Sequence, residues 1–170
     1  LVGESGCGKS TIAGILSAKN RGFSGEITIG GIPLAEVDET DLMKRVVLVR
    51  HNSYLFKGTV EENLRMAKPD ATEEELYNVL EKVNLAGFLR TQDGLQTKLL
   101  EKASNLSGGQ CQRVAIARAL LRETESSVFI FDEAASNIDV ESEELIMEVI
   151  HELARTKTVL LISHRLANVV

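Results

Sequence analysis

Apolar residues form two kinds of pattern along the chain: short continuous runs, and single residues that recur at helical spacing. Short continuous apolar runs lie at 46–49, 128–131 and 158–162, each bounded by polar or turn-forming residues. Runs of this length are typical of strands buried on both faces, so they predict parallel strands inside a sheet. Leu1 and Val2 are expected to end a further strand.

Between these runs, apolar residues recur at helical spacing. Thr72 and Glu75 have the spacing of a capping box, and Asp139 is a candidate N-cap for a second amphipathic helix. A third helix is expected from about Ser107 to Leu121. Strands that alternate with helices predict an α/β domain with a mostly parallel sheet. The apolar helix positions are Leu76, Val79, Leu80 and Val83 after Thr72, and Leu145, Ile146, Val149, Ile150 and Leu153 after Asp139.

Two stretches interrupt this alternation. Residues 59–121 carry helical signals and no convincing strand, which predicts a helical insertion between two strands of the sheet. Residues 25–31, GEITIGG, alternate apolar and polar side chains and then turn, as an antiparallel or edge strand does. We expect a core formed by 1–51 and 122–170, a mainly helical subdomain over 52–121, and a small antiparallel β element.

Composition favours a single compact domain. The chain has 170 residues, of which 44% are hydrophobic, enough to bury a sizeable core. Its net charge of −6 argues against a nucleic-acid partner unless a local basic patch exists. Cys7 and Cys111 lack the paired spacing of metal ligands and fit a reducing compartment. Because the chain starts at Leu1 within an apolar segment, we expect it to be part of a longer protein; its apolar runs are far shorter than the ~20 residues of a membrane helix.

The stretch GESGCGKS at 3–10 matches the phosphate-loop pattern Gly-x-x-x-x-Gly-Lys-Ser. Its glycines let the backbone wrap a phosphate chain, Lys9 offers a charge to the terminal phosphates, and the Ser10 hydroxyl can bind Mg²⁺. An incidental glycine turn is the alternative, but the motif lies between an apolar segment and helix formers. The Cys7 side chain is dispensable to this mechanism. The residues expected to bind nucleotide are Gly3, Glu4, Ser5, Gly6, Cys7, Gly8, Lys9, Ser10 and Thr11.

Polar residues follow two of the predicted strands directly. Asp132 and Glu133 come after the run at 128–131, and His164 comes after the run at 158–162. Ligands bind at the carboxyl ends of strands in α/β sheets. Asp132 can help to hold Mg²⁺, and Glu133 can polarise an attacking water as a general base. Each pattern is weak alone, because acidic residues often follow strands and a lone histidine is usually structural, but together with a phosphate loop they indicate a catalytic site.

A second anion-binding pattern, NLSGGQCQR, occupies 105–113 at the start of the third predicted helix. A phosphate loop, LSGGQ, DE after a strand, and a later strand-end histidine occur here in the order and approximate spacing of ATP-binding-cassette (ABC) ATPases. The chain resembles that family along nearly its whole length. The resemblance implies a P-loop NTPase that uses ATP and Mg²⁺ and pairs head to tail with a second such domain. It also implies that Ser107, Gly108, Gly109 and Gln110 contact ATP held by the partner, that Glu133 is the catalytic base, that His164 contacts the γ-phosphate, and that Asp139 communicates across the dimer.

Residues 53–64 and 97–110 resemble segments of exporter-type domains that are fused to transmembrane helices. This resemblance implies ATP-driven export at the cytoplasmic face of the cell membrane, with a transmembrane domain upstream and Glu101 beside the contact with it. The alternative is that Leu55 and Phe56 belong to the core and that 61–63 is a solvated helix face. A non-transport ABC ATPase that acts on nucleic acid or ribosomes, or a low-turnover regulatory module, are the competing functions.

Two positions depart from the family pattern. His51 stands where the family usually has a glutamine, which offers a neutral oxygen towards Mg²⁺ and water. Imidazole binds metal only when neutral, so we expect a weaker or pH-sensitive metal site and slower hydrolysis. The alternatives are that Asn52 substitutes or that His51 is a neutral structural replacement. Ala103 stands where a glycine is usual, near Glu101.

Overall fold

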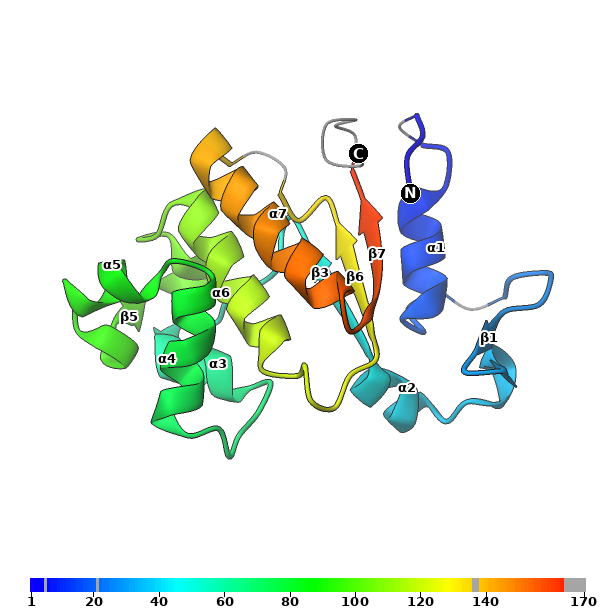
Figure 1. Cartoon of the computed structure of the whole chain (residues 1–170), viewed down its shortest axis with the longest axis horizontal. Helices are drawn as coiled ribbons and strands as arrows, with labels where there is room; N and C mark the ends of the chain where they lie inside the picture. Colours follow the sequence, from blue (N-terminus) through cyan, green and yellow to red (C-terminus); the bar gives the residue numbers. More distant parts are fainter. Residues whose placement is uncertain (5, 21, 136–137, 164–170) are drawn as a thin grey trace.

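The centre of the molecule is a parallel sheet with the strand order β3-β6-β7 (Figure 1). The structure is a computed structural model and describes residues 1–170 except 5, 21, 136–137 and 164–170. The strands are β3 (Val46–Arg50), β6 (Val128–Asp132) and β7 (Thr158–Ile162), and they confirm the three predicted strands. Arg50 is paired with Asp132, which in turn is paired with Ile162, so the three strands end at one edge of the sheet.

Helices cover both faces of this sheet, with α1 (Lys9–Leu16) on one side and α6 (Gly108–Leu120) and α7 (Val140–Ala154) on the other (Figure 1). Successive strand residues point to opposite faces. Phe129 and Phe131 belong to the large core beneath α6 and α7, whereas Ile130 packs in the smaller cluster with Ala13 of α1. Because both faces are covered, the strands are apolar except at Thr158 and at the terminal residues Arg50 and Asp132.

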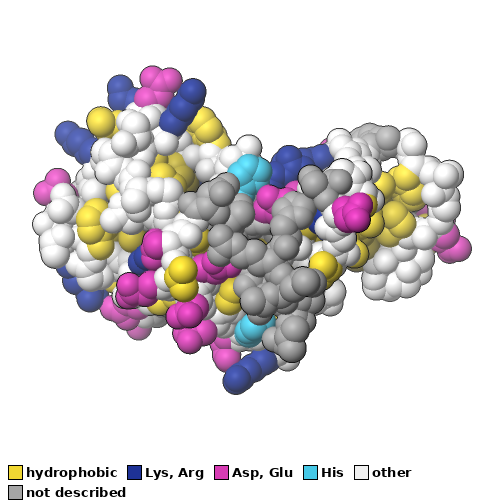
Figure 2. Space-filling model, turned by 90° about the horizontal axis from the view of Figure 1, so that it is seen from above, with side chains coloured by type: hydrophobic (Ala, Val, Ile, Leu, Met, Phe, Trp, Pro, Cys, Tyr) yellow, Lys and Arg dark blue, Asp and Glu magenta, His cyan; other side chains and the backbone are white. Residues whose placement is uncertain are grey.

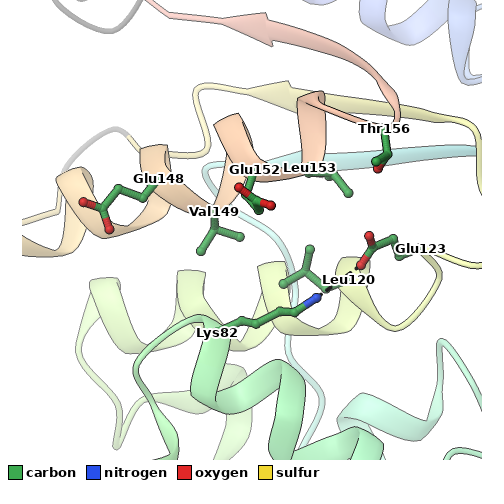
Figure 3. A pocket seen from close by; sticks show the side chains of 8 residues that line it. All are labelled: Lys82, Leu120, Glu123, Glu148, Val149, Glu152, Leu153 and Thr156. Atoms are coloured by element: carbon green, nitrogen blue, oxygen red, sulfur yellow. Dashed lines mark hydrogen bonds and ion pairs between the residues drawn. The ribbon is translucent and has the colours of Figure 1, made fainter.

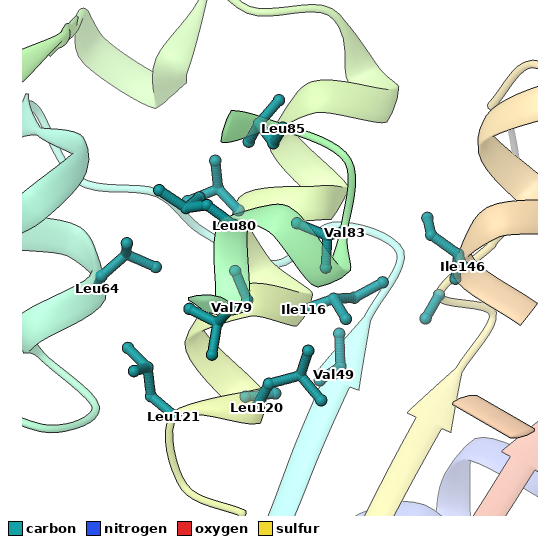
Figure 4. Packing of buried hydrophobic residues seen from close by; sticks show 14 of the residues in the cluster. Val49, Leu64, Val79, Leu80, Val83, Leu85, Ile116, Leu120, Leu121 and Ile146 are labelled. Carbon is teal, nitrogen blue, oxygen red and sulfur yellow. The ribbon is translucent and has the colours of Figure 1, made fainter. Parts of the chain in front are cut away.

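The helical layer between β3 and β6 consists of α3 (Val60–Arg65), α4 (Glu73–Lys82), α5 (Ala86–Arg90) and α6. Leu64, Leu80 and Ile116 are fully buried where these helices meet (Figure 4). Three of the helices begin with a capping box, which satisfies backbone N–H groups of the first turn and is worth roughly 1 kcal/mol at each N-cap. In the described part of the chain, no helix combines the length and apolar character needed to cross a membrane. The capping boxes pair Thr59 with Glu62, Thr72 with Glu75, and Ser107 with Gln110.

Two short antiparallel ladders lie outside the main sheet. In the first, β1 (Thr28–Ile29) pairs with β2 (Ile32–Pro33) through a turn of two glycines with positive φ, which confirms the expectation for 25–31. In the second, β4 (Gly58–Thr59) pairs with β5 (Lys98–Leu99). The expectation that 59–121 contains no strand is therefore wrong, because a two-residue ladder has no period that a sequence can display. The remaining elements are α2 (Glu39–Arg45), which Asp38 caps, and the 3₁₀ turns η1 (Leu34–Glu36), η2 (Gly94–Gln96) and η3 (Glu101–Ala103).

The expectation of a strand at Leu1 and Val2 is also wrong. The amino nitrogen of Leu1 donates to the carbonyl of Leu161 at 2.6 Å, so the segment lies beside β7, but it forms no ladder there. The fold class itself is confirmed: an α/β domain with a mostly parallel core, small antiparallel elements and helices inserted between β3 and β6.

Candidate active site

The phosphate loop closes around its own lysine. Lys9 is only 6% exposed, and its Nζ donates to the carbonyls of Gly3 at 2.7 Å and Glu4 at 2.8 Å. Gly8 caps α1 with a φ of 98°, in the left-handed region that L side chains rarely adopt. The loop therefore curls back over the first turn of α1, where backbone N–H groups are free to bind an anion. Cys7 is exposed, and its Sγ is 3.7 Å from the Lys9 Nζ.

The loop meets the end of β6 through one hydrogen bond across the fold. The Ser10 hydroxyl donates to Oδ1 of Asp132 at 3.0 Å, although the two residues are 122 positions apart. Asp132 is 6% exposed, because it points to the α1 face of the sheet, as Ile130 does. A hydroxyl oxygen and a carboxylate oxygen at this spacing are the hard ligands that Mg²⁺ prefers, so the donor set fits that ion.

Glu133 has a strained backbone. Its φ is 54°, a left-handed value that is unfavourable for a residue with a Cβ, and its N–H donates to the carbonyl of Ile162 at 3.0 Å. Strain of this kind, worth about 1–3 kcal/mol, persists only when surrounding structure enforces it and is frequent in active sites. The bond to β7 thus fixes the direction in which the chain leaves β6.

His51 is exposed, and its N–H donates to the backbone carbonyl of Asp132 at 3.2 Å. It therefore follows β3 directly at the same sheet edge. The metal-binding role of the His51 imidazole stays a prediction. Ser5 and His164, also predicted site residues, lie outside the described residues.

The LSGGQ turn at 106–110 is held by its own helix and by α7. Ser107 and Gln110 form the capping box of α6, with Ser107 Oγ accepting from the Gln110 N–H at 3.2 Å. Ser107 and Gly108 are exposed, but Gly109 is buried. A Cβ at Gly109 would lie 3.2 Å from the Ser142 Oγ and 3.4 Å from the Asp139 Oδ2. Gly109 thus allows α6 to approach α7 within this chain.

Asp139 caps α7 and joins it to α6. Its carboxylate accepts from the Ser142 N–H at 2.8 Å and from the Ser142 hydroxyl at 2.7 Å. These hydrogen bonds lower the pKa of Asp139, to which the guanidinium of Arg113 adds a smaller effect. Arg113 itself donates to the Ser142 hydroxyl and to the carbonyl of Asn84. A network of hydrogen bonds therefore links α6 to Asp139 at the start of α7.

The motifs did not include Arg50, and Gln112 entered only as part of the stretch at 105–113, with no role assigned. Arg50 ends β3 opposite Asp132, and its Nε is 3.9 Å from Oδ2 of that residue. Gln112 is buried and its Nε2 donates to the Arg50 carbonyl at 3.2 Å. The available signal was the position of Arg50, directly after an apolar strand that ends at the same sheet edge as Asp132.

Figure 2 looks onto the edge where the strands end and shows basic, acidic and histidine side chains beside one another near the middle of that face. A cavity of about 460 Å³ lies elsewhere, between the C-terminal ends of α4 and α6 and the side of α7 that faces them (Figure 3). None of the predicted site residues lines it. Its floor is apolar and its rim carries an ion pair of 3.4 Å between Lys82 and Glu123. The lining residues are Lys82, Leu120, Glu123, Glu148, Val149, Glu152, Leu153 and Thr156.

Comparison with known proteins assigns the chain to one family. Residues 1–136 match the family described as "ABC transporter". An uncharacterized ABC transporter ATP-binding protein of Haemophilus influenzae is 53% identical over 169 residues, which is 99% of this chain and 30% of that protein. An ATP-dependent lipid A-core flippase of Neisseria gonorrhoeae is 39% identical over 99% of this chain and 27% of its own length.

A solved structure of a bacterial Atm1-family ABC exporter with ATP bound has the same fold. It superposes with a TM-score of 0.91 at 34% identity, over 99% of this chain and 29% of that one. The chain thus spans less than a third of the length of each of these relatives.

Proposed function

The chain belongs to the ABC transporter family, and from this premise we propose that it binds and hydrolyses ATP to power export across a membrane. The observation that carries the proposal is the meeting of the phosphate loop with the end of β6, where Ser10 contacts Asp132 at 3.0 Å and Lys9 lies buried in the loop. Two motifs far apart in sequence are thereby brought to one sheet edge, as phosphoryl transfer requires.

In the proposed reaction, the N–H groups of residues 3–11 and the Lys9 ammonium bind the phosphate chain, which places the terminal phosphate near Ser10 and Asp132. Ser10 and Asp132 would hold magnesium, which supplies positive charge against the charge that develops on the phosphate oxygens. Glu133, fixed by its bond to Ile162, accepts the proton of the attacking water. His164 is proposed to contact the γ-phosphate, and His51 to modulate the metal site.

A second domain of the same kind is the proposed partner, whether an identical or a related chain. The exposed turn of Ser107 and Gly108, together with Gln110, is proposed to face ATP held by the partner's phosphate loop. A Cβ at Gly109 would lie 3.4 Å from the Asp139 Oδ2, so the LSGGQ turn and the N-cap of α7 lie side by side in one chain. ATP would join the two domains, and the split products would join them less well.

A transmembrane domain is the second proposed partner, with this domain at the cytoplasmic face of the membrane. The ladder between β4 and β5 brings the segments 53–64 and 97–110 together. Tyr54, Phe56 and Leu100 are about half exposed on these segments, and the rings of Tyr54 and Phe56 lie edge to face at 4.8 Å. Exposed apolar side chains gathered in this way favour a protein contact. The alternative that these residues belong to the core holds for Leu55, which is 2% exposed, but not for Phe56, which is 47% exposed.

The hydrolytic role is tested with Glu133→Gln in the full-length protein. The variant should retain ATP binding and prolong an ATP-dependent dimer, seen by size-exclusion chromatography with light scattering, while phosphate release falls by at least about a hundredfold. Lys9→Ala should weaken ATP binding itself, measured by calorimetry. Glu36→Gln, an exposed carboxylate on η1, is the matched control and should behave as the wild type. Normal hydrolysis by Glu133→Gln would remove Glu133 from its proposed role.

The export role is tested by the complete reading frame. We expect apolar helices upstream of Leu1 that are long enough to span a membrane. Salt-sensitive binding of the purified protein to DNA or RNA would instead favour a function on nucleic acid.

A further inference from the structure

Arg50 is a positive side chain that no motif singles out and that lies beside Asp132. The two residues are paired in the register of β3 and β6. Val46, Ile130 and Ile162 of the three strands all pack on the α1 side, so the alternation of strand residues sends the Arg50 and Asp132 side chains to that side as well. Asp132 therefore lies between the Ser10 hydroxyl at 3.0 Å and the Arg50 Nε at 3.9 Å.

The contact between Arg50 and Asp132 is an ion pair without a hydrogen bond. A separation of 3.9 Å is too long for one, and the Nε is buried with no hydrogen-bond partner among the described residues. The side chain as a whole is 38% exposed, so the guanidinium extends from a buried Nε towards solvent. A buried N–H without an acceptor is unfavourable, and a phosphate oxygen brought into the site would offer it one.

The backbone of Arg50 is held by hydrogen bonds to Ser53 and to α6. The Arg50 carbonyl accepts from the Ser53 hydroxyl at 2.8 Å and from Gln112 at 3.2 Å, and its N–H donates to the Ser53 Oγ at 3.1 Å. Gln112 is 4% exposed and belongs to α6. These bonds set the point from which the Arg50 side chain leaves β3.

The positive charge of Arg50 has two opposite effects: it stabilises the Asp132 carboxylate when no metal is bound, and it repels a metal ion bound there. The Asp132 side chain is only 8% exposed, and a carboxylate buried to that extent is unfavourable without a nearby positive charge. Arg50 provides such a charge when no metal is bound. A divalent cation held by Ser10 and Asp132 would compete with it, because like charges a few ångströms apart repel in a partly buried site.

We propose that Arg50 is an internal counter-ion of Asp132 that supports the binding of metal-free nucleotide triphosphate and opposes magnesium at Ser10 and Asp132. This rests on the proposed function and adds a determinant of metal selectivity to the same site. A neutral residue at position 50 should therefore increase the advantage that the magnesium complex of the nucleotide has over the free nucleotide.

The test measures the affinity of the full-length protein for the fluorescent analogue MANT-ATP, once with excess Mg²⁺ and once with EDTA. The quantity of interest is the dissociation constant in EDTA divided by that in Mg²⁺. In Arg50→Gln and Arg50→Met this ratio should rise about tenfold, which corresponds to about 1.4 kcal/mol. Arg50→Lys keeps the charge and should stay within about threefold of the wild type. Arg45→Gln, which removes an exposed charge just before β3, should leave the ratio unchanged.

Three results would count against the inference. One is a ratio that is unchanged in both neutral variants, whether or not both affinities fall by the same factor. Another is a fall of the ratio in the neutral variants. The third is a shift in Arg50→Lys as large as in Arg50→Gln, which would show that Arg50 does not act through its charge. If the wild type binds MANT-ATP and one of these results follows, the inference about Arg50 fails while the proposed function stands. If the wild type binds the analogue under neither condition, the proposed function fails with it.

Discussion

Replacing Asn63 with alanine should destabilise the domain by about 3 kcal/mol. Asn63 is fully buried in α3, and its side chain makes three hydrogen bonds to the backbone just before the helix. Oδ1 accepts from the Phe56 N–H at 2.8 Å, and Nδ2 donates to the carbonyls of Phe56 and Thr59, both at 2.9 Å. Each bond contributes about 1 kcal/mol net, and alanine leaves three backbone groups without their partner. For a domain of this size the loss lowers the melting temperature by roughly 6–12 °C.

Urea denaturation followed by circular dichroism measures this loss, with an unchanged m-value as the sign that only stability has changed. Asn105→Ala is the matched control. Asn105 also bridges a loop, donating to the Lys98 carbonyl and accepting from the Leu100 N–H, both at 2.9 Å, but it is exposed. Water can replace its bonds, so we expect a loss of under about 1 kcal/mol. Hydrogen exchange at the Phe56 amide should accelerate in Asn63→Ala and not in the control. Equal losses in the two variants would refute the reasoning, because it depends on the burial of Asn63 and on its one additional hydrogen bond.

Two further predictions concern backbone strain and charge. Ala18 follows the end of α1 with a φ of 57°, so Ala18→Gly should raise stability by about 0.5 kcal/mol in a urea melt, whereas Asn84→Gly, at a similar φ of 51°, should change little because asparagine tolerates this conformation. A lower midpoint for Ala18→Gly would contradict this. The pKa of Asp139 is lowered by its bonds to Ser142, so its stabilising effect is present above its ordinary pKa and is lost as the pH falls through the lowered value. Asp139→Asn should therefore be less stable than the wild type near neutral pH, with a difference that shrinks as the pH is lowered from about 5 to about 3; a difference independent of pH would contradict the assignment.

The main strands and two of the helices were predictable because each is marked by a local pattern in the sequence. Strands β3, β6 and β7 are covered on both faces, so the sequence shows them as unbroken apolar runs. The helix at Glu73–Lys82 begins at its capping box, and the helix at Val140–Ala154 begins after its N-cap. In each case the signal and the structure that it predicts lie within a few residues of each other.

Features that depend on how segments pack in three dimensions were not predictable in the same way. A solvated helix face was the alternative to a transporter contact for 61–63, and no sequence pattern indicates that Asn63 turns inward to bond the backbone of Phe56 and Thr59. The pairing of Arg50 with Asp132 requires the register between two strands that are far apart in sequence. The glycine of LSGGQ at position 109 was assigned to nucleotide alone, and its close approach to Ser142 depends on how α6 crosses α7. Ala103, noted for replacing a glycine, has a φ of 52°, so the position keeps the left-handed backbone even with a side chain.

Helix α6 belongs to two parts of the molecule at once. It begins at the LSGGQ turn, packs against α3 and α4, and also lies on β3, with Val114, Ile116 and Ala117 fully buried. At 13 residues it is a rod of about 20 Å, and a rod held along its side cannot pivot independently of either neighbour. Because α6 packs against α3, α4 and β3 at once, a displacement of the helical layer relative to the sheet cannot leave the LSGGQ turn in place.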